Sequence, residues 1–520
     1  MRFNSSIVTH RFDVPVLATL LQHAREAPDA PAFLLDEILI TYGDFAGTVT
    51  RLASFAAAQG IRPGMLIGIR IHDRLLHVAV VFACEACGAG TASLTDADAQ
   101  TWTEGFAACD MLFADGTTPP HPRRIDLSPE TIRRVTGARG TGARGTGADP
   151  ARPPNLACPP RAAARVIKSS GTTGAPKPIA LGPAAMAAIL RHRCDLIARF
   201  GPEVAVFLCL YEPDFDRALT YVRAMLMLRR IVAFSAARLK GLTLPWFTLA
   251  TPGSIRPVIV AAESLPKARF VDINGAAVDP RTWDLVATLA EAVVVNYGMN
   301  EATGISWVGR DGVGTLCDGV GTLCDGVEAR IDRDPSLSTR QRKAGLISVR
   351  APTLAQGYLG HRDLTSRHFT KGWFRTGDLG FQPGPGQLVV LGRADDLLNL
   401  GGVKLAPNPL EAEICAACDV SAAVLLTVPD SDGVERLCVI LETPDPEDSA
   451  GLGNRVAEVV GRYADQFQVM VRTVLPRNDG GKIRRDVLRT ELTRQRGSAG
   501  RRSMSCLVGT GLIVGAESAK

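Results

Sequence analysis

The segment 167–179, IKSSGTTGAPKPI, carries the residue types that bind a polyphosphate. Hydroxyl side chains donate hydrogen bonds to phosphate oxygens, glycine lets the backbone approach them closely, and lysine supplies a positive charge. The expected phosphate contacts are Ser169, Ser170, Gly171, Thr172, Thr173, Gly174 and Lys177. The lysine comes three residues after the second glycine, whereas a Walker loop has it directly after that glycine. The segment therefore predicts a phosphate-binding loop of a different kind.

A second candidate site, YGMNE at 297–301, follows the apolar run 292–295. The run predicts a buried strand, so we expect the motif in a turn at the strand's carboxyl end, where α/β sheets bind ligands. The ring of Tyr297 can stack on a purine. The carboxylate of Glu301 can hold Mg²⁺ against phosphate oxygens, and the amide of Asn300 can donate to those oxygens.

Four further segments complete an ordered set of motifs. They are INGAA at 273–277, WFRTGDL at 373–379, GRADD at 392–396 and PRNDGGKIRRDVL at 476–488. Together with the two sites above, and in their order along the chain, these segments resemble the motifs of the adenylate-forming, or AMP-binding, superfamily. That superfamily includes acyl-CoA synthetases, peptide-synthetase adenylation domains and luciferases.

The resemblance implies a role for each matching residue. It identifies Lys482 as the adenylation lysine, whose ammonium would stabilise negative charge on the α-phosphate and on departing pyrophosphate. It identifies Glu301 as the catalytic carboxylate and metal ligand, and Asp395 as the hinge between two domains. Asp378 is implied to accept the ribose hydroxyls. The implied nucleotide contacts are Gly275, Ala276, Ala277, Asn296, Tyr297, Gly298, Asp378 and Arg393.

Two positions depart from the family's pattern. Asn300 stands where threonine is usual, and an amide reaches a phosphate differently from a hydroxyl. Pro178 stands where glycine is usual; it removes one backbone N–H and biases Lys177 toward an extended conformation. Both substitutions fall in or beside predicted phosphate contacts, so they bear on activity rather than on fold.

The elements that must position these motifs are strands and helices in alternation. A helical period covers 16–27, a strand leading into a helix is expected at 38–45, and 59–69 predicts a helix end, a turn and a buried strand. This pattern continues past residue 300 and predicts α/β layers. The resemblance implies a large multi-layer α/β domain at 10–393 and a small mobile α+β lid domain at 394–495. A tail of unknown role, 496–520, follows.

Composition is that of an ordinary globular protein, with 46% hydrophobic and 21% charged residues. A net charge of +5 on 520 residues is mild and indicates no nucleic-acid partner. No stretch reaches about 18 continuous apolar residues, so we expect no membrane span and a cytoplasmic location. Cys-x-x-Cys spacing occurs at Cys84 with Cys87 and at Cys415 with Cys418. Both pairs lie in helix-like apolar runs without companion histidines, so we interpret them as buried free thiols rather than zinc ligands.

Two short duplications interrupt the pattern. The sequence TGARG at 136–140 recurs at 141–145, and DGVGTLC at 311–317 recurs at 318–324. The first contains GTGARG at 140–145, a formal dinucleotide fingerprint, but we expect a flexible linker because no strand precedes it. The second is expected to lengthen a loop.

The sequence predicts an ATP-dependent enzyme that activates a small carboxylic acid through an acyl-adenylate and then forms a thioester with coenzyme A (CoA). Its cofactors would be ATP and Mg²⁺, with CoA as co-substrate. The nearest alternative is a stand-alone amino-acid or aryl-acid adenylating enzyme that loads a carrier protein, since FDRA at 215–218 resembles the site of an aspartate that holds an α-amino group. A catalytically weakened binding homologue and an NAD-dependent oxidoreductase are further alternatives.

Overall fold

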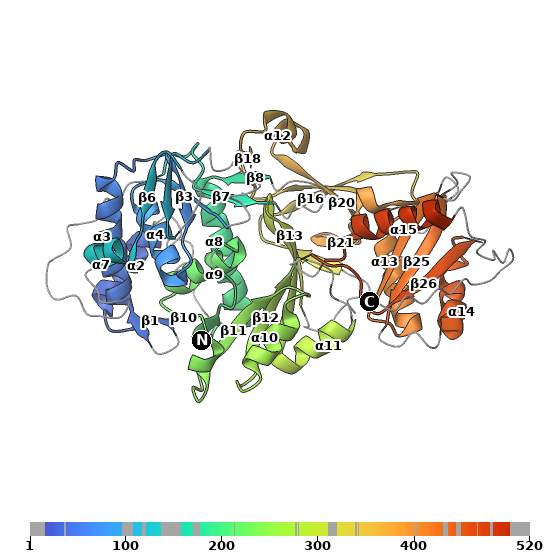
Figure 1. Ribbon diagram of the computed structural model, residues 1–520, viewed down its shortest axis with the longest axis horizontal. Helices are drawn as coiled ribbons and strands as arrows, with labels where there is room; N and C mark the ends of the chain where they lie inside the picture. The colour runs from blue at the N-terminus through green and yellow to red at the C-terminus, as the bar shows by residue number, and fades with distance from the viewer. Residues whose placement is uncertain are drawn as a thin grey trace.

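The computed structural model describes most of the chain. The described residues are 16–35, 38–95, 108–116, 121–136, 158–169, 177–212, 214–275, 278, 280–309, 320–338, 341, 343–400, 403–429, 435–443, 449–464, 466–478 and 482–499. Strands alternate with helices along the chain and assemble into helix-covered sheets (Figure 1). The predicted α/β class is therefore confirmed.

A seven-stranded sheet forms near the amino terminus in the order β18-β8-β7-β4-β3-β5-β6. Its strands are β3 (Leu66–Arg70), β4 (Gly90–Ser93), β5 (Met111–Ala114), β6 (Arg124–Asp126), β7 (Arg165–Lys168), β8 (Pro178–Leu181) and β18 (Gly357–Tyr358). The neighbouring helices are α2 (Val16–Glu26), α3 (Tyr42–Ala58), α4 (Arg74–Ala86) and α7 (Pro129–Thr136). The blue and cyan elements among them, such as α3, α7, β3 and β6, occupy the left side of Figure 1.

A fourteen-stranded sheet forms the middle of the molecule in the order β16-β17-β20-β21-β15-β14-β13-β12-β11-β9-β10-β1-β2, with β19 paired to β20. Its strands are β1 (Pro31–Leu34), β2 (Leu39–Thr41), β9 (Val206–Leu208), β10 (Ile231–Ala233), β11 (Trp246–Ala250), β12 (Ala268–Asn274), β13 (Ala290–Met299), β14 (Ala302–Gly309), β15 (Val320–Leu323), β16 (Glu328–Arg333), β17 (Gly345–Arg350), β19 (Phe369–Thr370), β20 (Trp373–Phe381) and β21 (Gln387–Arg393). The accompanying helices are α8 (Pro183–Phe200), α9 (Asp216–Met227), η1 (Ala236–Leu239), α10 (Ile255–Ala262), α11 (Pro280–Leu289) and α12 (Arg362–His368). From β10 through β13 neighbouring strands run parallel, as expected for strands buried on both faces.

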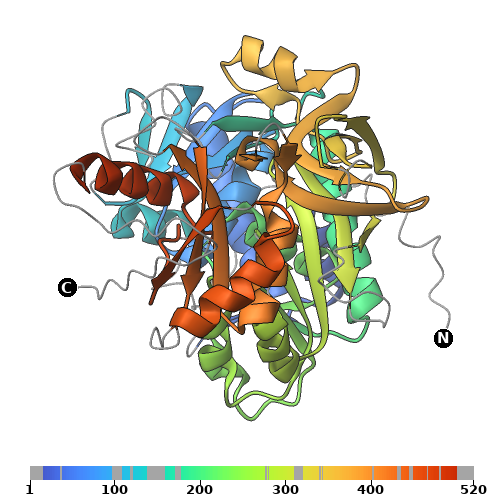
Figure 2. The same cartoon turned by 90° about the vertical axis from the view of Figure 1, so that its right-hand side faces the viewer.

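The carboxyl-terminal part forms two small sheets with their own hydrophobic cores. Its elements are η3 (Ala394–Asp396), β22 (Leu398–Leu400), β23 (Val403–Leu405), α13 (Pro407–Cys418), β24 (Ala422–Pro429), β25 (Glu435–Glu442), α14 (Ser449–Val460), β26 (Phe467–Arg472) and α15 (Arg485–Ala499). Buried residues of these elements pack mainly with one another, on both faces of the β24-β25-β26 sheet. The orange and red lobe is seen at the right of Figure 1 and faces the viewer in Figure 2. The predicted domain division at 393/394 falls between β21 and η3 and remains a prediction.

Local sequence explains the elements that were predicted near the amino terminus. The strand-to-helix segment at 38–45 becomes β2 and α3, because Thr41 and Asp44 form a reciprocal capping box that satisfies backbone N–H groups. Gly60, at φ +91°, follows the end of α3, and β3 comes next. The predictions at 16–27, 38–45 and 59–69 are therefore confirmed.

Two sequence expectations differ from the structure. The segment 297–301 is not a complete turn: β13 continues through Met299, because it pairs antiparallel with β14 and only 300–301 form the turn. The second copy of the duplicated heptad does not simply lengthen a loop. Its residues 320–323 form β15, which pairs with β14 and β21. The first copy at 311–317 and the linker at 137–148 lie outside the described residues.

The cysteines of the described residues are free thiols. Cys84 and Cys87 lie at the buried end of α4, and burial raises the pKa of the Cys87 thiol to about 11. Across the described ranges, no three His, Cys, Asp or Glu side chains group closely enough to hold a metal ion. No helix in the described part of the chain is long and apolar enough to cross a membrane.

Candidate active site

The predicted phosphate loop leaves β7 at Lys168 and returns at β8. The backbone N–H of Ser169 donates to the carbonyl of Lys177 at 3.0 Å, and the N–H of Lys177 donates to Oγ of Ser169 at 2.9 Å. These bonds close the base of the loop. The predicted contacts Ser170, Gly171, Thr172, Thr173 and Gly174 lie outside the described residues.

Pro178 lies where its missing N–H matters little for pairing with β7. Because Ser169 and Lys177 form a hydrogen-bonded pair, the next pair, Lys168 with Pro178, is of the non-hydrogen-bonded kind. The Pro178 carbonyl accepts from the N–H of Leu359 at 2.8 Å, so the proline also helps to hold β18. The backbone of β8 thus accommodates the departure from glycine.

The β13–β14 turn is held against the base of the phosphate loop. The side-chain amide of Asn300 donates to the carbonyl of Lys168. This contact differs from the phosphate contact predicted for Asn300. Its effect is to link the turn that carries Glu301 to the start of the loop.

Glu301 and Lys177 both contact a residue that the sequence analysis missed, Tyr358. The Tyr358 hydroxyl donates to Oε1 of Glu301 at 2.9 Å, and Nζ of Lys177 lies 6.0 Å from the centre of the Tyr358 ring. Tyr358 is in place because β18 pairs with β8, opposite Ile179. Burial, followed by the nearby carboxylate, raises the pKa of Tyr358, so its hydroxyl keeps its proton and remains a donor. Its only sequence signal is a Gly-Tyr pair, which is common in turns.

Tyr297, Asp378 and Arg393 form a second group. The Tyr297 hydroxyl donates to Oδ2 of Asp378 at 2.6 Å, and Nε of Arg393 lies 3.2 Å from Oδ1 of the same carboxylate. The β20–β21 register places Asp378 opposite Arg393, and Arg393 also donates to the carbonyl of Thr376 at 3.1 Å. Burial raises the pKa of Asp378, while Arg393 opposes that shift. An aromatic ring, a carboxylate and a guanidinium therefore meet where the nucleotide was predicted.

Lys482 reaches this group from the carboxyl-terminal lobe. Its backbone is bonded to Asn478: the Lys482 N–H donates to Oδ1 of Asn478 at 2.9 Å, and the Asn478 N–H donates to the Lys482 carbonyl at 2.9 Å. Burial lowers the pKa of Lys482, as does Arg393, whereas Asp396 and Asp378 raise it. The ammonium is thus close enough to interact electrostatically with the predicted nucleotide contacts.

Asp395, the predicted hinge, is exposed in η3. The next residue, Asp396, lies 3.8 Å from Nε of Arg485, and Arg485 also bonds Glu411 at 2.6 Å. Asp396 and Arg485 were not singled out from the sequence. They connect η3 to the lobe that carries Lys482.

The remaining predicted nucleotide contacts are only partly placed. Gly275 directly follows β12 at φ +97°, whereas Ala276 and Ala277 lie outside the described residues. A Cβ on Gly298 would come within 2.8 Å of the Gly304 backbone nitrogen, so the two backbones approach closely. The Asn296 side chain donates to Oδ1 of Asp272 at 2.5 Å. It lies on the face of β13 opposite to the Tyr297 side chain, because neighbouring residues of a strand point to opposite faces.

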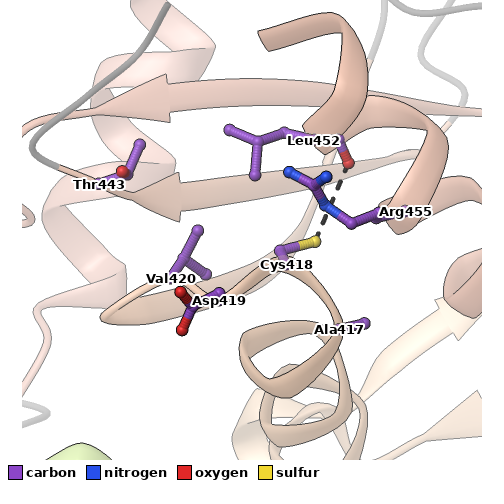
Figure 3. A pocket seen from close by; sticks show the side chains of 7 residues that line it. All are labelled: Ala417, Cys418, Asp419, Val420, Thr443, Leu452 and Arg455. Atoms are coloured by element: carbon purple, nitrogen blue, oxygen red, sulfur yellow. Dashed lines mark hydrogen bonds between the residues drawn. The ribbon is translucent and has the colours of Figure 1, made fainter. Parts of the chain in front are cut away.

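A separate cavity of about 320 Å³ opens in the carboxyl-terminal lobe, between the end of α13 and α14 (Figure 3). Its lining residues are Ala417, Cys418, Asp419, Val420, Thr443, Leu452 and Arg455. None of the predicted site residues lines it. The candidate active site is therefore the group built around Tyr358, Asp378 and Lys482.

The sequence of residues 20–359 matches the family of AMP-binding enzymes. Among individual relatives, phenyloxazoline synthase MbtB of Mycobacterium sp. (strain MCS) is 25% identical over 91% of this chain, which spans only 41% of the synthase. The probable CoA ligase CCL9 of Humulus lupulus is 23% identical, with 92% of this chain and 96% of the ligase aligned.

A solved structure has a similar fold. ATP-bound MatB from Rhodopseudomonas palustris superposes with a TM-score of 0.76 over 92% of this chain and 99% of that protein, at 20% identity. The likeness therefore includes the carboxyl-terminal lobe as well as the two larger sheets.

Proposed function

The chain belongs to the family of AMP-binding enzymes, and from this we propose that it activates a carboxylic acid with ATP and transfers the acyl group to CoA. It is an AMP-forming ligase of the acyl-CoA synthetase type. The observation that carries this proposal is the group of Tyr297, Asp378 and Arg393, joined by contacts of 2.6 and 3.2 Å, with which Lys482 of the carboxyl-terminal lobe interacts electrostatically. These groups offer an ammonium for the α-phosphate beside a carboxylate for the ribose.

In the first step, a carboxylate oxygen of the acid attacks the α-phosphorus, and the bond to the β-phosphate oxygen breaks to release pyrophosphate. Negative charge grows on the α-phosphate and on the leaving pyrophosphate, and the Lys482 ammonium stabilises it. Asp378 accepts the ribose hydroxyls while Arg393 holds the carboxylate. The Tyr297 ring provides the face on which adenine stacks.

The residues present fit a magnesium ion. Tyr358 bonds the Glu301 carboxylate through Oε1, and among the described residues Oε2 has no hydrogen-bond donor, so it offers a hard anionic oxygen to the cation. When bound, Mg²⁺ would neutralise charge on the phosphates. The Lys177 ammonium, held near the Tyr358 ring, adds a second positive charge on the same side.

In the second step, the CoA sulfur attacks the acyl carbonyl carbon, AMP leaves, and the thiol proton is released. We propose that 394–495 is a lid that turns about Asp395 and withdraws Lys482 before this step. Cytoplasmic location and CoA as the acceptor are parts of the same proposal.

An amino-acid substrate is disfavoured by one contact. Asp216, the position that resembles an α-amino binder, accepts from Nε of Arg165 at 2.9 Å, and the Arg165 side chain is only 1% exposed. A carboxylate already neutralised by a buried guanidinium binds an ammonium weakly. We therefore place amino-acid adenylation below CoA ligation.

ATP–pyrophosphate exchange over a panel of aliphatic, aryl and amino acids tests the first step, and CoA-dependent AMP release tests the second. Lys482→Met should lower exchange by about 100-fold or more, as expected for a lost preorganised cation. The same variant should still form thioester from added acyl-adenylate. Lys343→Met, at an exposed lysine, is the matched control. Exchange with no acid, or exchange with amino acids alone, would contradict the proposal.

A further inference from the structure

A buried group of polar side chains lies against the strand that carries Tyr297. We call this group the polar cluster; its members are His192, Arg193, Arg217, Tyr221, Asp272 and Asn296. Asp272 is its centre: Oδ2 lies 2.6 Å from Nη2 of Arg217 and accepts from the Tyr221 hydroxyl at 2.7 Å. Oδ1 accepts from the Asn296 amide. The proposed mechanism uses none of these side chains.

The polar cluster adjoins the candidate active site. Asn296 directly precedes Tyr297 in β13, and the two side chains lie on opposite faces of the strand. On the cluster side, a Cβ on Gly304 would come within 2.4 Å of the His192 ring. Gly304 in turn packs against Gly298, the residue after Tyr297. Only small residues and one strand therefore separate the cluster from the predicted nucleotide contacts.

The polar cluster holds an excess of positive charge. Arg217 is paired with Asp272, but Arg193 forms no ion pair with any residue in the described ranges. The Arg193 side chain is 1% exposed, its Nε donates to Thr220 at 3.2 Å, and its guanidinium lies 5.0 Å from the Tyr221 ring centre. Burial and the nearby Arg217 lower the pKa of Arg193 to about 10, although Tyr221, Asp272 and Asp216 oppose the shift, so Arg193 is still charged at neutral pH.

An unpaired buried charge is costly, which is why buried charges in proteins are generally matched by a partner or a ligand. Asp216, the carboxylate at the start of α9, is already bonded to Arg165. His192 does not add a charge, because burial lowers its pKa well below the usual value. The described protein thus supplies two guanidinium groups and one carboxylate at this place.

Within the described part of the chain, three buried polar atoms of the cluster find no hydrogen-bond partner. They are Nη1 of Arg193, Nε2 of His192 and Oδ1 of Asn296. Such atoms normally find a partner when buried. Their presence in one cluster, next to the site where an acid is activated, indicates a place for a polar ligand group.

We infer that the acid substrate carries a second anionic group, remote from the carboxylate that is activated, and that Arg193 and Arg217 bind this group. The inference rests on the proposed function and names its substrate class: a dicarboxylic or sulfo-carboxylic acid. Arginine suits this role because its planar donors match carboxylate and sulfonate oxygens. Arg193 supplies the unmatched charge, and Nε2 of His192 supplies a donor when its proton lies there.

The test measures pyrophosphate exchange with acids matched in length. Dicarboxylic acids of three to six carbons and sulfoacetate are compared with monocarboxylic acids of the same lengths, and benzoate is included. We expect at least one dianionic acid to exceed its matched monoanionic acid by about tenfold or more in kcat/KM, as for a well-placed charged contact. The dicarboxylate and sulfonate arms decide which anion is preferred.

Arg193→Gln should raise KM for the preferred dianionic acid about tenfold and leave the kinetics with a monocarboxylic acid nearly unchanged. Arg199→Gln, on the same helix with its guanidinium 4.4 Å from the Trp307 ring centre, is the matched control and should leave both unchanged. Because Arg193 has no ion-pair partner among the residues that the structure describes, we expect the protein to stay folded when it is replaced. The double variant Arg217→Gln with Asp272→Asn removes both charges of the neighbouring ion pair together and gives a second test. The double variant should also raise KM for the dianionic acid.

A preference for acids with uncharged tails would overturn the inference and leave the proposed function standing. The inference would also be overturned if the ratio of kcat/KM for the dianionic acid to kcat/KM for the matched monoanionic acid were the same in Arg193→Gln as in the wild type. Exchange with no acid would overturn both.

Discussion

Replacing Tyr358 with phenylalanine removes one hydroxyl and keeps the ring. The hydroxyl donates to Glu301 Oε1 at 2.9 Å, and Tyr358 is 7% exposed, so the bond is largely shielded from water. Hydrogen bonds to charged groups contribute about 1.5–3 kcal/mol. Because Glu301 is only half-buried, water can partly replace the lost donor, and we expect about 1–2 kcal/mol. In rate, this is a loss of roughly 5- to 30-fold.

The loss should be seen in the magnesium dependence as well as in the rate. Without the tyrosine donor, Glu301 is no longer held in one orientation, so exchange by Tyr358→Phe should require more Mg²⁺ for half-maximal rate. The Lys177 ammonium still faces an aromatic ring, so the apparent affinity for ATP at saturating Mg²⁺ should change little. Tyr358→Leu removes the ring too, and it should also weaken ATP binding.

Pyrophosphate exchange is measured with the best acid at increasing Mg²⁺, together with urea unfolding to report stability. Tyr463→Phe, in the carboxyl-terminal lobe beside Arg462, is the matched control and should keep wild-type exchange. If Tyr358→Phe exchanged within twofold of wild type and needed no more Mg²⁺, the assignment of Glu301 and Tyr358 to one metal-binding unit would be wrong.

Three further predictions follow from single contacts. Pro178→Gly should leave exchange and ATP affinity nearly unchanged, because Pro178 pairs with Lys168 at a non-hydrogen-bonded position; a large gain in exchange would show that the proline impairs the loop. Gln341→Ala removes two hydrogen bonds to the backbone of buried Ala406, at 2.9 and 3.2 Å, so urea unfolding should show a loss of about 1–2 kcal/mol. Because Ala406 lies in the proposed lid, pyrophosphate exchange should fall together with stability, while thioester formation from added acyl-adenylate persists. An equal loss of exchange and of thioester formation would refute a role of Gln341 in placing the lid. Burial raises the pKa of Asp378, so its ionised form, which we propose binds ribose, is lost as pH falls through that raised value. Adenosine binding, measured by calorimetry from neutral pH to about pH 4, should weaken on acidification. The folding contribution has the opposite sign: a raised folded pKa stabilises the fold at low pH, and this stabilisation is lost as pH rises through it. Binding that strengthens on acidification would contradict the assignment.

Several features of the site could be predicted from the chain because they are local. The α3 cap at Thr41 and the end of α3 near Gly60 depend on residues within a few positions of one another, so sequence rules apply directly. The roles of Asp378 and Lys482 were implied by the resemblance of short motifs, in a fixed order, to a known family, and they stay predictions. The amide of Asn300 was predicted to donate to a phosphate. In the structure it donates to the Lys168 carbonyl, a contact that no local rule anticipates.

The contacts that the chain could not predict join residues far apart in sequence. Tyr358 meets Glu301 only because β18 adds to the edge of β8, and the Tyr297 hydroxyl meets Asp378 only through the order of strands in the fourteen-stranded sheet. The duplicated heptad gave no sign that its second copy would become β15, since pairing with β14 and β21 decides it. The unmatched charge of Arg193 is likewise invisible in sequence, where arginines and carboxylates are equally common nearby.

By itself, the sequence determined which chemical groups this protein has and which family of folds can assemble them. The reason is that its hydroxyls, glycines, carboxylates and lysine stand at the spacings of known motifs. Only the tertiary structure decided which of those groups touch. Strand order and register bring Tyr358 to Glu301 and Asp378 to Arg393, and the placement of the carboxyl-terminal lobe brings Lys482 into electrostatic range of Asp378 and Arg393. The physical reason is that hydrogen bonds and charges act over a few ångströms, and such distances between remote segments are set by packing rather than by neighbouring residues.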